Sequence, residues 1–374
     1  MPATTIDLDA VDRLMARARR EVDDGLLPSA QVALALNGEL VAFETFGTES
    51  NDSRYIVYSA TKAFVAGAMW ALMGDGLIDE KATVAEVIPE FASNGKDAIT
   101  IEQVMLHTSG FPYAPMRPTD GATSQGRTAR FATWRLNWQP GSTYEYHATS
   151  AHWVLAELIE RVTGRDFRDV VHERVTEPAG LQRVLGRTTH RAAELHVVGA
   201  PASPDELQAA FGVSELDVGE VTTELLVSLG QPEAQAVGVP GGGGIMRAAD
   251  LALFYQAVLH NPGQMWRPDV LHDVTTNVRN RLPDRMTGLP ANRTLGLVQA
   301  GADGMSHLRG MGRTVSPRAI GHNGAKGQIA WADPDTGLSF GYCTNGLDEH
   351  AVREPKRTTA LASLAAVCAV RPSV

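Results

Sequence analysis

The sequence predicts an α/β protein in which strands from both ends of the chain form one layer. An Asn37-Gly38 turn joins two apolar-rich segments, 31–36 and 39–46, which is typical of a β-hairpin. A second hairpin is expected near the C-terminus, where a Pro-Asp-Thr-Gly turn separates 328–333 from 338–344. Between the hairpins the pattern is mostly helical. The expected architecture is therefore one layer built from both termini, with a helical region inserted in the middle.

The helices are predicted from the spacing of apolar residues. Residues 7–25 alternate apolar and charged positions at helical spacing. Further helices are expected over 61–73, 101–106, 150–163, 248–259 and 356–370. Segments 114–130 and 261–295 are rich in Pro, Gly, Thr, Asn and Arg, and are expected to be long loops.

Composition excludes several classes of protein. With 374 residues, two or three domains are expected, or one large domain with an insertion. Lys and Arg number 33 against 43 Asp and Glu, a net charge of −10 that disfavours nucleic-acid binding. No apolar run reaches the ~18 residues of a membrane span, and the N-terminus lacks an apolar signal core, so a cytoplasmic protein is expected. Cys343 and Cys368 are expected to be buried hydrophobes, and neither a metal nor another cofactor is predicted.

Two serine motifs compete for the role of nucleophile. The segment Gly337-Leu338-Ser339-Phe340-Gly341 matches G-x-S-x-G, a motif that requires a strand to end and a helix to begin at the serine. Here the apolar pattern continues through Thr344 as a strand and ends in an Asn-Gly turn. Ser339 is therefore predicted to be a small residue within a hairpin strand.

The S-x-x-K pattern occurs twice, although 17 serines and 5 lysines would give fewer than one match by chance. Ser93 and Lys96 lie around an Asn-Gly turn, and a surface loop is expected there. Ser59 and Lys62 instead open the run 63–73, which is apolar nearly all round and predicts a helix buried in the middle of the protein.

Ser59 and Lys62 have the spacing that a serine nucleophile and its base require. The i, i+3 spacing places them on one face of the first helical turn, where free N–H groups can stabilise an oxyanion. An apolar setting should lower the lysine pKa from about 10.4 toward neutrality, and a neutral amine beside a hydroxyl is a general base. The alternative is a helix-capping serine with a lysine that extends to solvent. The motif alone leaves both interpretations open.

Other segments strengthen the catalytic interpretation. Tyr146 stands before the helix 150–163, and Gly321-His322-Asn323-Gly324-Ala325 precedes the strand 328–333. S-x-x-K, this tyrosine and this third motif, in that order, resemble the serine β-lactamase and penicillin-binding protein superfamily. Leu-His-Thr-Ser-Gly-Phe-Pro at 106–112 and the glycine run that begins at 241 resemble further elements of it. The resemblance extends over about residues 28 to 350.

Two departures indicate a subgroup. Class C β-lactamases carry Tyr-x-Asn and Lys-Thr-Gly motifs, whereas this chain has Ala148 in place of the amide and His322 in place of the lysine. In the family, both missing groups help to bind β-lactams. The remaining pattern is similar to the family VIII carboxylesterases.

The resemblance implies a fold and a division of the chain. The fold would be β-lactamase-like, an α/β (α+β) arrangement with an antiparallel sheet flanked by the N- and C-terminal helices. Residues 1–78 and 240–374 would form the sheet domain, residues 79–239 a mostly helical domain, and the active site would lie in the cleft between them.

The resemblance also assigns roles. Ser59 would attack an ester carbonyl, while Lys62 and Tyr146 would share the proton transfers. Backbone N–H groups of Ser59 and Ala325 would form the oxyanion hole, and His322 with Gly324 would contact the substrate. The expected partner is a small-molecule ester, with no nucleic acid, no membrane and an undetermined oligomeric state. A β-lactamase, D-peptidase, amide hydrolase or acyltransferase on the same residues stays open, as does a non-catalytic binding protein with this fold.

Overall fold

A six-stranded antiparallel sheet forms the centre of the computed structural model, which describes residues 4–186, 192–216, 219 and 221–370. Its strand order is β3-β2-β10-β9-β8-β7, so the N-terminal hairpin lies beside the C-terminal hairpin. Smaller two-stranded sheets pair β1 with β12, β4 with β6, and β5 with β11. The strands are β1 Thr5–Ile6, β2 Ser29–Leu36, β3 Glu39–Gly47, β4 Tyr55–Ile56, β5 His196–Val198, β6 Ile245–Met246, β7 Val298–Gln299, β8 Ile320–Gly321, β9 Ile329–Asp333, β10 Leu338–Thr344, β11 Gly346–Asp348 and β12 Ala369–Val370.

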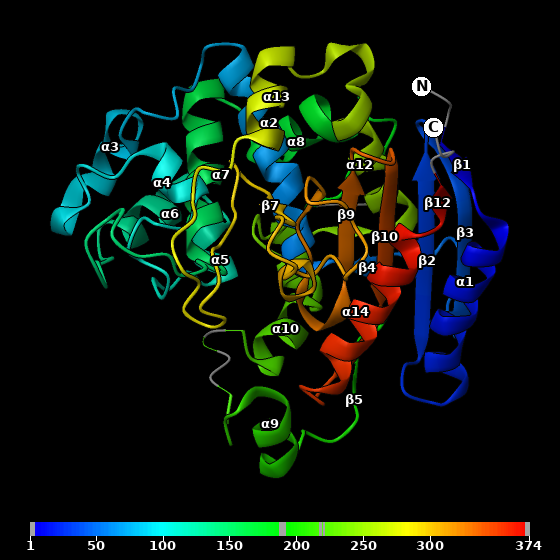
Figure 1. The fold of residues 1–374 in the computed structure, drawn as a ribbon. Coiled ribbons are helices and arrows are strands. Elements are labelled where there is room, and N and C mark those ends of the chain that lie inside the picture. Colours follow the sequence, from blue (N-terminus) through cyan, green and yellow to red (C-terminus); the bar gives the residue numbers. More distant parts are fainter. Residues whose placement is uncertain (1–3, 187–191, 217–218, 220, 371–374) are drawn as a thin grey trace.

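Helices cover both faces of this sheet and form most of the segment between the hairpins (Figure 1). The α-helices are α1 Leu8–Asp23, α2 Thr61–Gly74, α3 Val84–Val87, α4 Ile101–Met105, α5 Pro118–Gly121, α6 Ser124–Phe131, α7 Ser150–Thr163, α8 Phe167–Val171, α9 Pro204–Phe211, α10 Thr223–Leu229, α11 Pro232–Val237, α12 Ala248–His260, α13 Pro268–Thr276 and α14 Arg353–Ala366. Shorter helical turns are η1 Tyr58–Ala60, η2 Pro89–Gly95, η3 His172–Thr176, η4 Pro262–Gln264, η5 Ser306–Arg309 and η6 Ala325–Gly327.

Side-chain alternation along β10 shows how the two faces are filled. Leu338, Phe340 and Tyr342 belong to the core that the sheet forms with α1 and α14. Ser339 and Gly341 point to the opposite face, which α12 covers so closely that a Cβ on Gly341 would lie 2.0 Å from the Ala248 carbonyl oxygen. This period-two pattern is that of a strand buried on both sides.

Most predicted elements are present. Asn37 and Gly38 have φ values of 55° and 85°, as the type I′ turn of the first hairpin requires. The helix over 150–163 is α7, and Cys343 and Cys368 are both buried and free. The β-lactamase-like α/β fold is thereby confirmed, whereas the domain boundaries at 78/79 and 239/240 stay predictions.

Three element predictions were wrong. The segment 114–130 contains α5 and most of α6, whose first turn is capped by the Thr123 side chain. The segment 261–295 contains α13, which begins at Pro268. The last helix ends at Ala366 rather than 370, because Ala369 and Val370 pair with β1 and so bring the two chain ends together (Figure 1).

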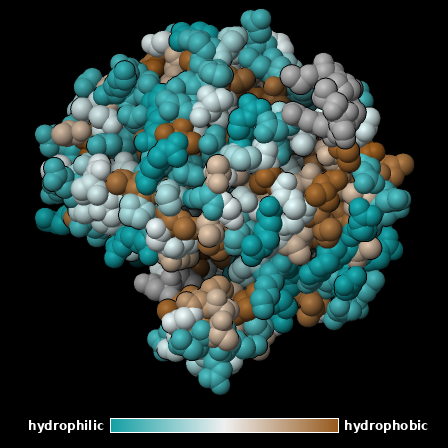
Figure 2. All heavy atoms as spheres, viewed as in Figure 1, coloured by the Kyte–Doolittle hydropathy of each residue, from teal (hydrophilic) through white to brown (hydrophobic). Residues whose placement is uncertain are grey.

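The surface matches the charged composition of the chain. Hydrophilic side chains cover most of the face seen in Figure 2. Across the described residues, every helix is too short or too polar to cross a lipid bilayer.

Candidate active site

Ser59 lies in a tight turn between strand β4 and helix α2. The residue before it, Tyr58, has a φ of 45°, a conformation that costs a non-glycine residue free energy and persists only where neighbours enforce it. The Val57 N–H donates to the Gly244 carbonyl at 3.0 Å, and the Gly244 N–H donates to Thr61 Oγ1 at 2.9 Å. Ser59 is half-exposed within a buried run, so its hydroxyl is held at the N-terminus of α2 and stays accessible.

Lys62 lies in the first turn of α2 and is fully buried. Its Nζ is 3.2 Å from Ser59 Oγ, 2.8 Å from the Ala148 carbonyl oxygen and 2.5 Å from the Gly241 carbonyl oxygen. A Cβ on Gly241 would lie 3.3 Å from this nitrogen. The absence of a side chain at Gly241 therefore lets the backbone approach the lysine closely.

Tyr146 precedes α7, and its ring is 5.1 Å from Lys62 Nζ. Burial raises the pKa of its hydroxyl to about 12, although Arg293 and the Ser59 hydroxyl both act to lower it. No hydrogen bond of normal geometry joins this hydroxyl to any part of the chain that the structure describes. Tyr146 is therefore a neutral phenol at neutral pH, with its polar atom directed at the Ser59 region.

The third motif lies between β8 and β9, next to the serine turn. A Cβ on Gly324 would be 2.0 Å from the Val57 carbonyl oxygen, so only glycine permits this approach of the two backbones. The His322 ring is 5.9 Å from the Tyr146 ring, and its Nδ1 lies 3.1 Å from the Asn323 carbonyl oxygen. The contact brings the segments that carry Ser59 and Ala325 together, while their roles in an oxyanion hole stay predicted.

Four buried histidines lie in this region and all are held neutral. Burial is the main cause, and it lowers the pKa of His147 to about 3. The pKa values of His107, His152 and His322 lie well below the usual value for the same reason, and the charges of Lys62 and Arg293 add to the effect for all three. His107 Nδ1 accepts the His147 backbone N–H at 3.1 Å, which is a structural contact.

The structure separates the three candidate serines. Ser59, Lys62 and Tyr146 lie together, as predicted. Ser339 is a buried strand residue, as expected, and its hydroxyl donates to the Ala252 carbonyl at 2.7 Å.

The second S-x-x-K match, Ser93 and Lys96, was expected to lie in a surface loop, and the structure corrects this. Lys96 is fully buried, and its Nζ donates to the Trp134 carbonyl at 2.9 Å and to Ser93 Oγ at 3.2 Å. Ser93 in turn donates to the Ala132 carbonyl at 3.0 Å. The Asn-Gly turn allows the lysine to fold back inside, so that this pair ties residues 93–96 to residues 132–134.

Lys96 should make stability depend on pH. Burial, with a smaller contribution from Arg135, lowers its pKa in the folded protein to about 8, against the ~10.4 of an unperturbed lysine. Between these values only the unfolded chain keeps the proton, so the contribution of Lys96 to the free energy of unfolding rises with pH. Urea unfolding from pH 7 to pH 10 should therefore show wild type gaining stability relative to Lys96→Met. The exposed Lys81→Met variant is the control, and a pH-independent difference for Lys96→Met would contradict the assignment.

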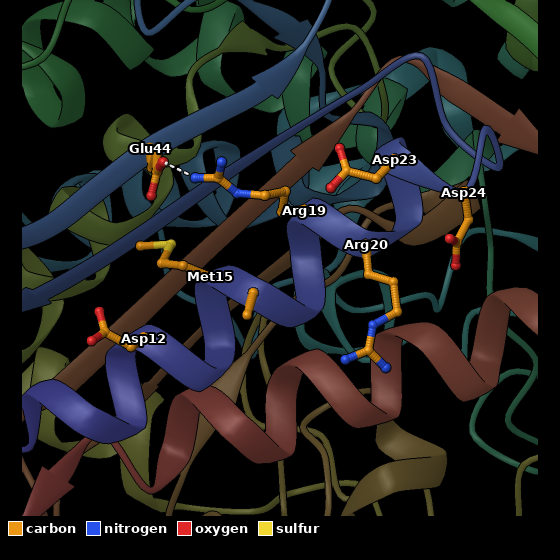
Figure 3. A pocket seen from close by; sticks show the side chains of 8 residues that line it. Asp12, Met15, Arg19, Arg20, Asp23, Asp24 and Glu44 are labelled. Atoms are coloured by element: carbon orange, nitrogen blue, oxygen red, sulfur yellow. Dashed lines mark hydrogen bonds and ion pairs between the residues drawn. The ribbon is translucent and has the colours of Figure 1, made fainter.

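Two surface hollows lie away from this region. One of about 500 Å³ is lined by charged residues of α1 and β3, among which Arg19 pairs with Glu44 at 2.8 Å (Figure 3). Another, of about 690 Å³, is lined by residues such as Asp166 and Arg183. Neither contains Ser59 or its neighbours. Across the described chain, no three His, Cys, Asp or Glu side chains are grouped as metal ligands.

Comparison with known proteins agrees with this geometry. The Beta-lactamase family matches residues 10–365. The chain belongs to the β-lactamase family. It is thus a member of the β-lactamase-fold serine hydrolases, as the three motifs predicted.

Three relatives show the similarity in sequence and in fold. The chain is 30% identical over 323 residues to the esterase/beta-lactamase LipL of Mycobacterium tuberculosis. The aligned region covers 80% of this chain and 70% of LipL. A solved family VIII carboxylesterase is 24% identical, with a TM-score of 0.75 over 97% of this chain and 99% of that one. A penicillin-binding protein homolog from Caulobacter crescentus is 23% identical, with a TM-score of 0.74 over 97% and 100%. The two structures establish a shared fold.

Arg293 is the residue of this region that the sequence did not indicate. It is buried, and its Cζ lies 5.1 Å from the Tyr146 ring. It belongs to a segment expected to be a loop, and 147 positions separate it from Tyr146. The one signal in the sequence is a lone arginine in the apolar stretch from Leu289 to Leu297.

Proposed function

We propose that this protein is a serine hydrolase that cleaves small carboxylic esters through an acyl-enzyme on Ser59. The main support for this proposal is that the buried Lys62 Nζ lies 3.2 Å from the Ser59 hydroxyl, at the N-terminus of α2. No metal or cofactor is needed for this chemistry.

Three hydrogen-bond contacts of Lys62 fit the role of a base. A neutral amine has two N–H donors and one lone pair. The Ala148 and Gly241 carbonyls can only accept, so they take the two N–H groups. Of the three partners, only the Ser59 hydroxyl can donate to the lone pair. The same three contacts also hold the ammonium ion after Lys62 has taken the serine proton.

Tyr146 fits the complementary role. Its hydroxyl is neutral at neutral pH, since burial raises the pKa to about 12, and a neutral phenol is a proton donor. In the proposed acylation, Ser59 Oγ bonds to the ester carbonyl carbon while its proton moves to Lys62. The C–O bond to the alcohol then breaks, and Tyr146 protonates the departing oxygen. Lys62 returns a proton to Tyr146, and water later cleaves the acyl-enzyme by the same relay in reverse.

The remaining proposed roles concern the substrate. Backbone N–H groups of Ser59 and Ala325 would bind the oxyanion, each worth about 3 kcal/mol in the transition state. His322 and Gly324 would line the acyl site. Because His322 is neutral, the third motif offers no positive charge to a substrate carboxylate, which favours uncharged esters over β-lactams and peptides with a free C-terminus.

The test compares acyl donors on one enzyme preparation. We expect hydrolysis of p-nitrophenyl acetate and butyrate with a kcat/KM at least about a hundredfold above that for nitrocefin or a D-alanyl-D-alanine peptide. A fluorophosphonate should label Ser59, as identified by peptide mass spectrometry. Faster nitrocefin or peptide turnover would replace the ester assignment by a β-lactamase or peptidase. Absence of both labelling and turnover would indicate a binding protein.

A further inference from the structure

Arg293 is held firmly between two segments of the chain. Its Nε donates to the Tyr144 hydroxyl at 2.8 Å, and its backbone N–H donates to the Asn280 carbonyl at 3.0 Å. In return, the Arg293 carbonyl accepts from the Asn280 N–H at 3.1 Å. The side chain is 6% exposed, so the guanidinium is fixed in position rather than free in solvent.

This fixed guanidinium lies over the proposed proton donor. Arg293 Cζ and Lys62 Nζ are each 5.1 Å from the centre of the Tyr146 ring. Arg293 Nη1 is buried and has no hydrogen-bond partner in the described part of the chain. A buried cationic nitrogen without an acceptor is costly, and such atoms cluster where charge changes during function.

Among the residues that the structure describes, Lys62 is the other cation beside the Tyr146 ring. His107, His147 and His322 are neutral for the reasons given above. The adjacent Glu145 accepts from Tyr113 and from Arg285, the latter at 2.8 Å. Lys62 and Arg293 are therefore the two cations that act on the Tyr146 oxygen.

We propose that Arg293 is a positioning residue that stabilises the negative charge on Tyr146 at the moment it protonates the leaving alcohol. This rests on the proposed ester hydrolysis. When the Tyr146 proton moves to the departing oxygen, the phenol becomes a phenolate beside two positive charges, until Lys62 returns a proton to it. Arg293 itself neither gives nor takes a proton, and it touches no reacting atom.

The leaving group distinguishes this role from a structural one. p-Nitrophenolate departs without a proton, whereas benzyl alkoxide requires one. Arg293→Gln should lower kcat/KM for benzyl butyrate at least about tenfold, since a charge at this distance shifts a pKa by one or more units. For p-nitrophenyl butyrate, which has the same acyl group, the loss should stay within about threefold. Arg293→Lys keeps the charge and should recover most of the benzyl ester activity.

Two controls separate failure of this inference from failure of the ester assignment. In a Tyr146→Phe background, Arg293→Gln should have no further effect on benzyl ester hydrolysis. The exposed neighbour Arg281→Gln should behave as wild type on both esters. Equal losses on both esters, or equal losses with and without Tyr146, would overturn the role of Arg293. If Arg293→Gln raised only the KM, and only for esters that carry a carboxylate, the result would overturn the proposed role and would indicate that Arg293 binds an anionic substrate group. Full activity of Ser59→Ala would instead overturn the proposed function itself.

Discussion

Replacement of Ser59 by alanine is expected to lower kcat/KM for p-nitrophenyl butyrate by at least about a thousandfold, as for other catalytic nucleophiles. The physical reason is that no other group in the site can form the acyl-enzyme. Lys62 Nζ is fully buried and directed at three oxygens, and Tyr146 is a weak nucleophile as a neutral phenol. Steady-state kinetics and loss of fluorophosphonate labelling measure the effect.

The other two candidate serines provide matched controls. Ser339→Ala removes a hydroxyl that donates to the Ala252 carbonyl and accepts from Gln256, so it should cost about 1 kcal/mol of stability and leave turnover intact. Ser93→Ala keeps Lys96 in place and should also stay active. If Ser339→Ala or Ser93→Ala were the inactive, folded variant, the choice of nucleophile would be wrong.

Replacement of Arg357 by methionine is expected to destabilise the fold by about 2–3 kcal/mol, because it removes a buried cation that two carboxylates share, although Arg17 still pairs with Glu21 and Arg353 with Asp348. Arg357 is 1% exposed and donates to Glu21 at 2.6 Å and to Asp348 at 2.7 Å. These residues belong to α14, α1 and β11, so one guanidinium joins both ends of the chain. Methionine retains much of the apolar volume, and urea unfolding at pH 7 measures the loss.

An exposed ion pair is the control for Arg357. Arg174 pairs with Asp75 at 2.7 Å, and both side chains are more than a third exposed. Solvent screens such pairs, so Arg174→Met should change the urea midpoint only slightly. Equal midpoints for the two variants would show that the buried bridge adds little to stability.

Local patterns in the sequence were sufficient for most of the elements and for placing Ser339 in a strand. The apolar run after Lys62 could only be a helix buried on all sides, and α2 is that helix. The G-x-S-x-G segment lacked a following helix, and Ser339 is accordingly a strand residue. Such conclusions hold because periodicity and turn chemistry act within a few residues of one another.

Predictions failed where a distant contact decided the outcome. Lys96 was expected in a surface loop, yet it is buried and donates to the Trp134 carbonyl, 38 positions further along the chain. The last helix is shorter than predicted because residues 369 and 370 pair with strand β1 instead. Residues 114–130 were expected to form a loop, but they include most of α6, a helix whose Arg127 and Phe131 side chains are buried against other parts of the fold.

The sequence by itself determined the sheet hairpins, the buried helix, the S-x-x-K pair and the family to which these belong. Only the tertiary structure decided which carbonyls surround Lys62, that the histidines near Tyr146 are neutral, and that Arg293 lies over the Tyr146 ring. Each of these depends on burial and on the approach of segments far apart in the chain. Desolvation and Coulomb interaction act through space rather than along the sequence, so the electrostatics of the site exist only once the chain has folded.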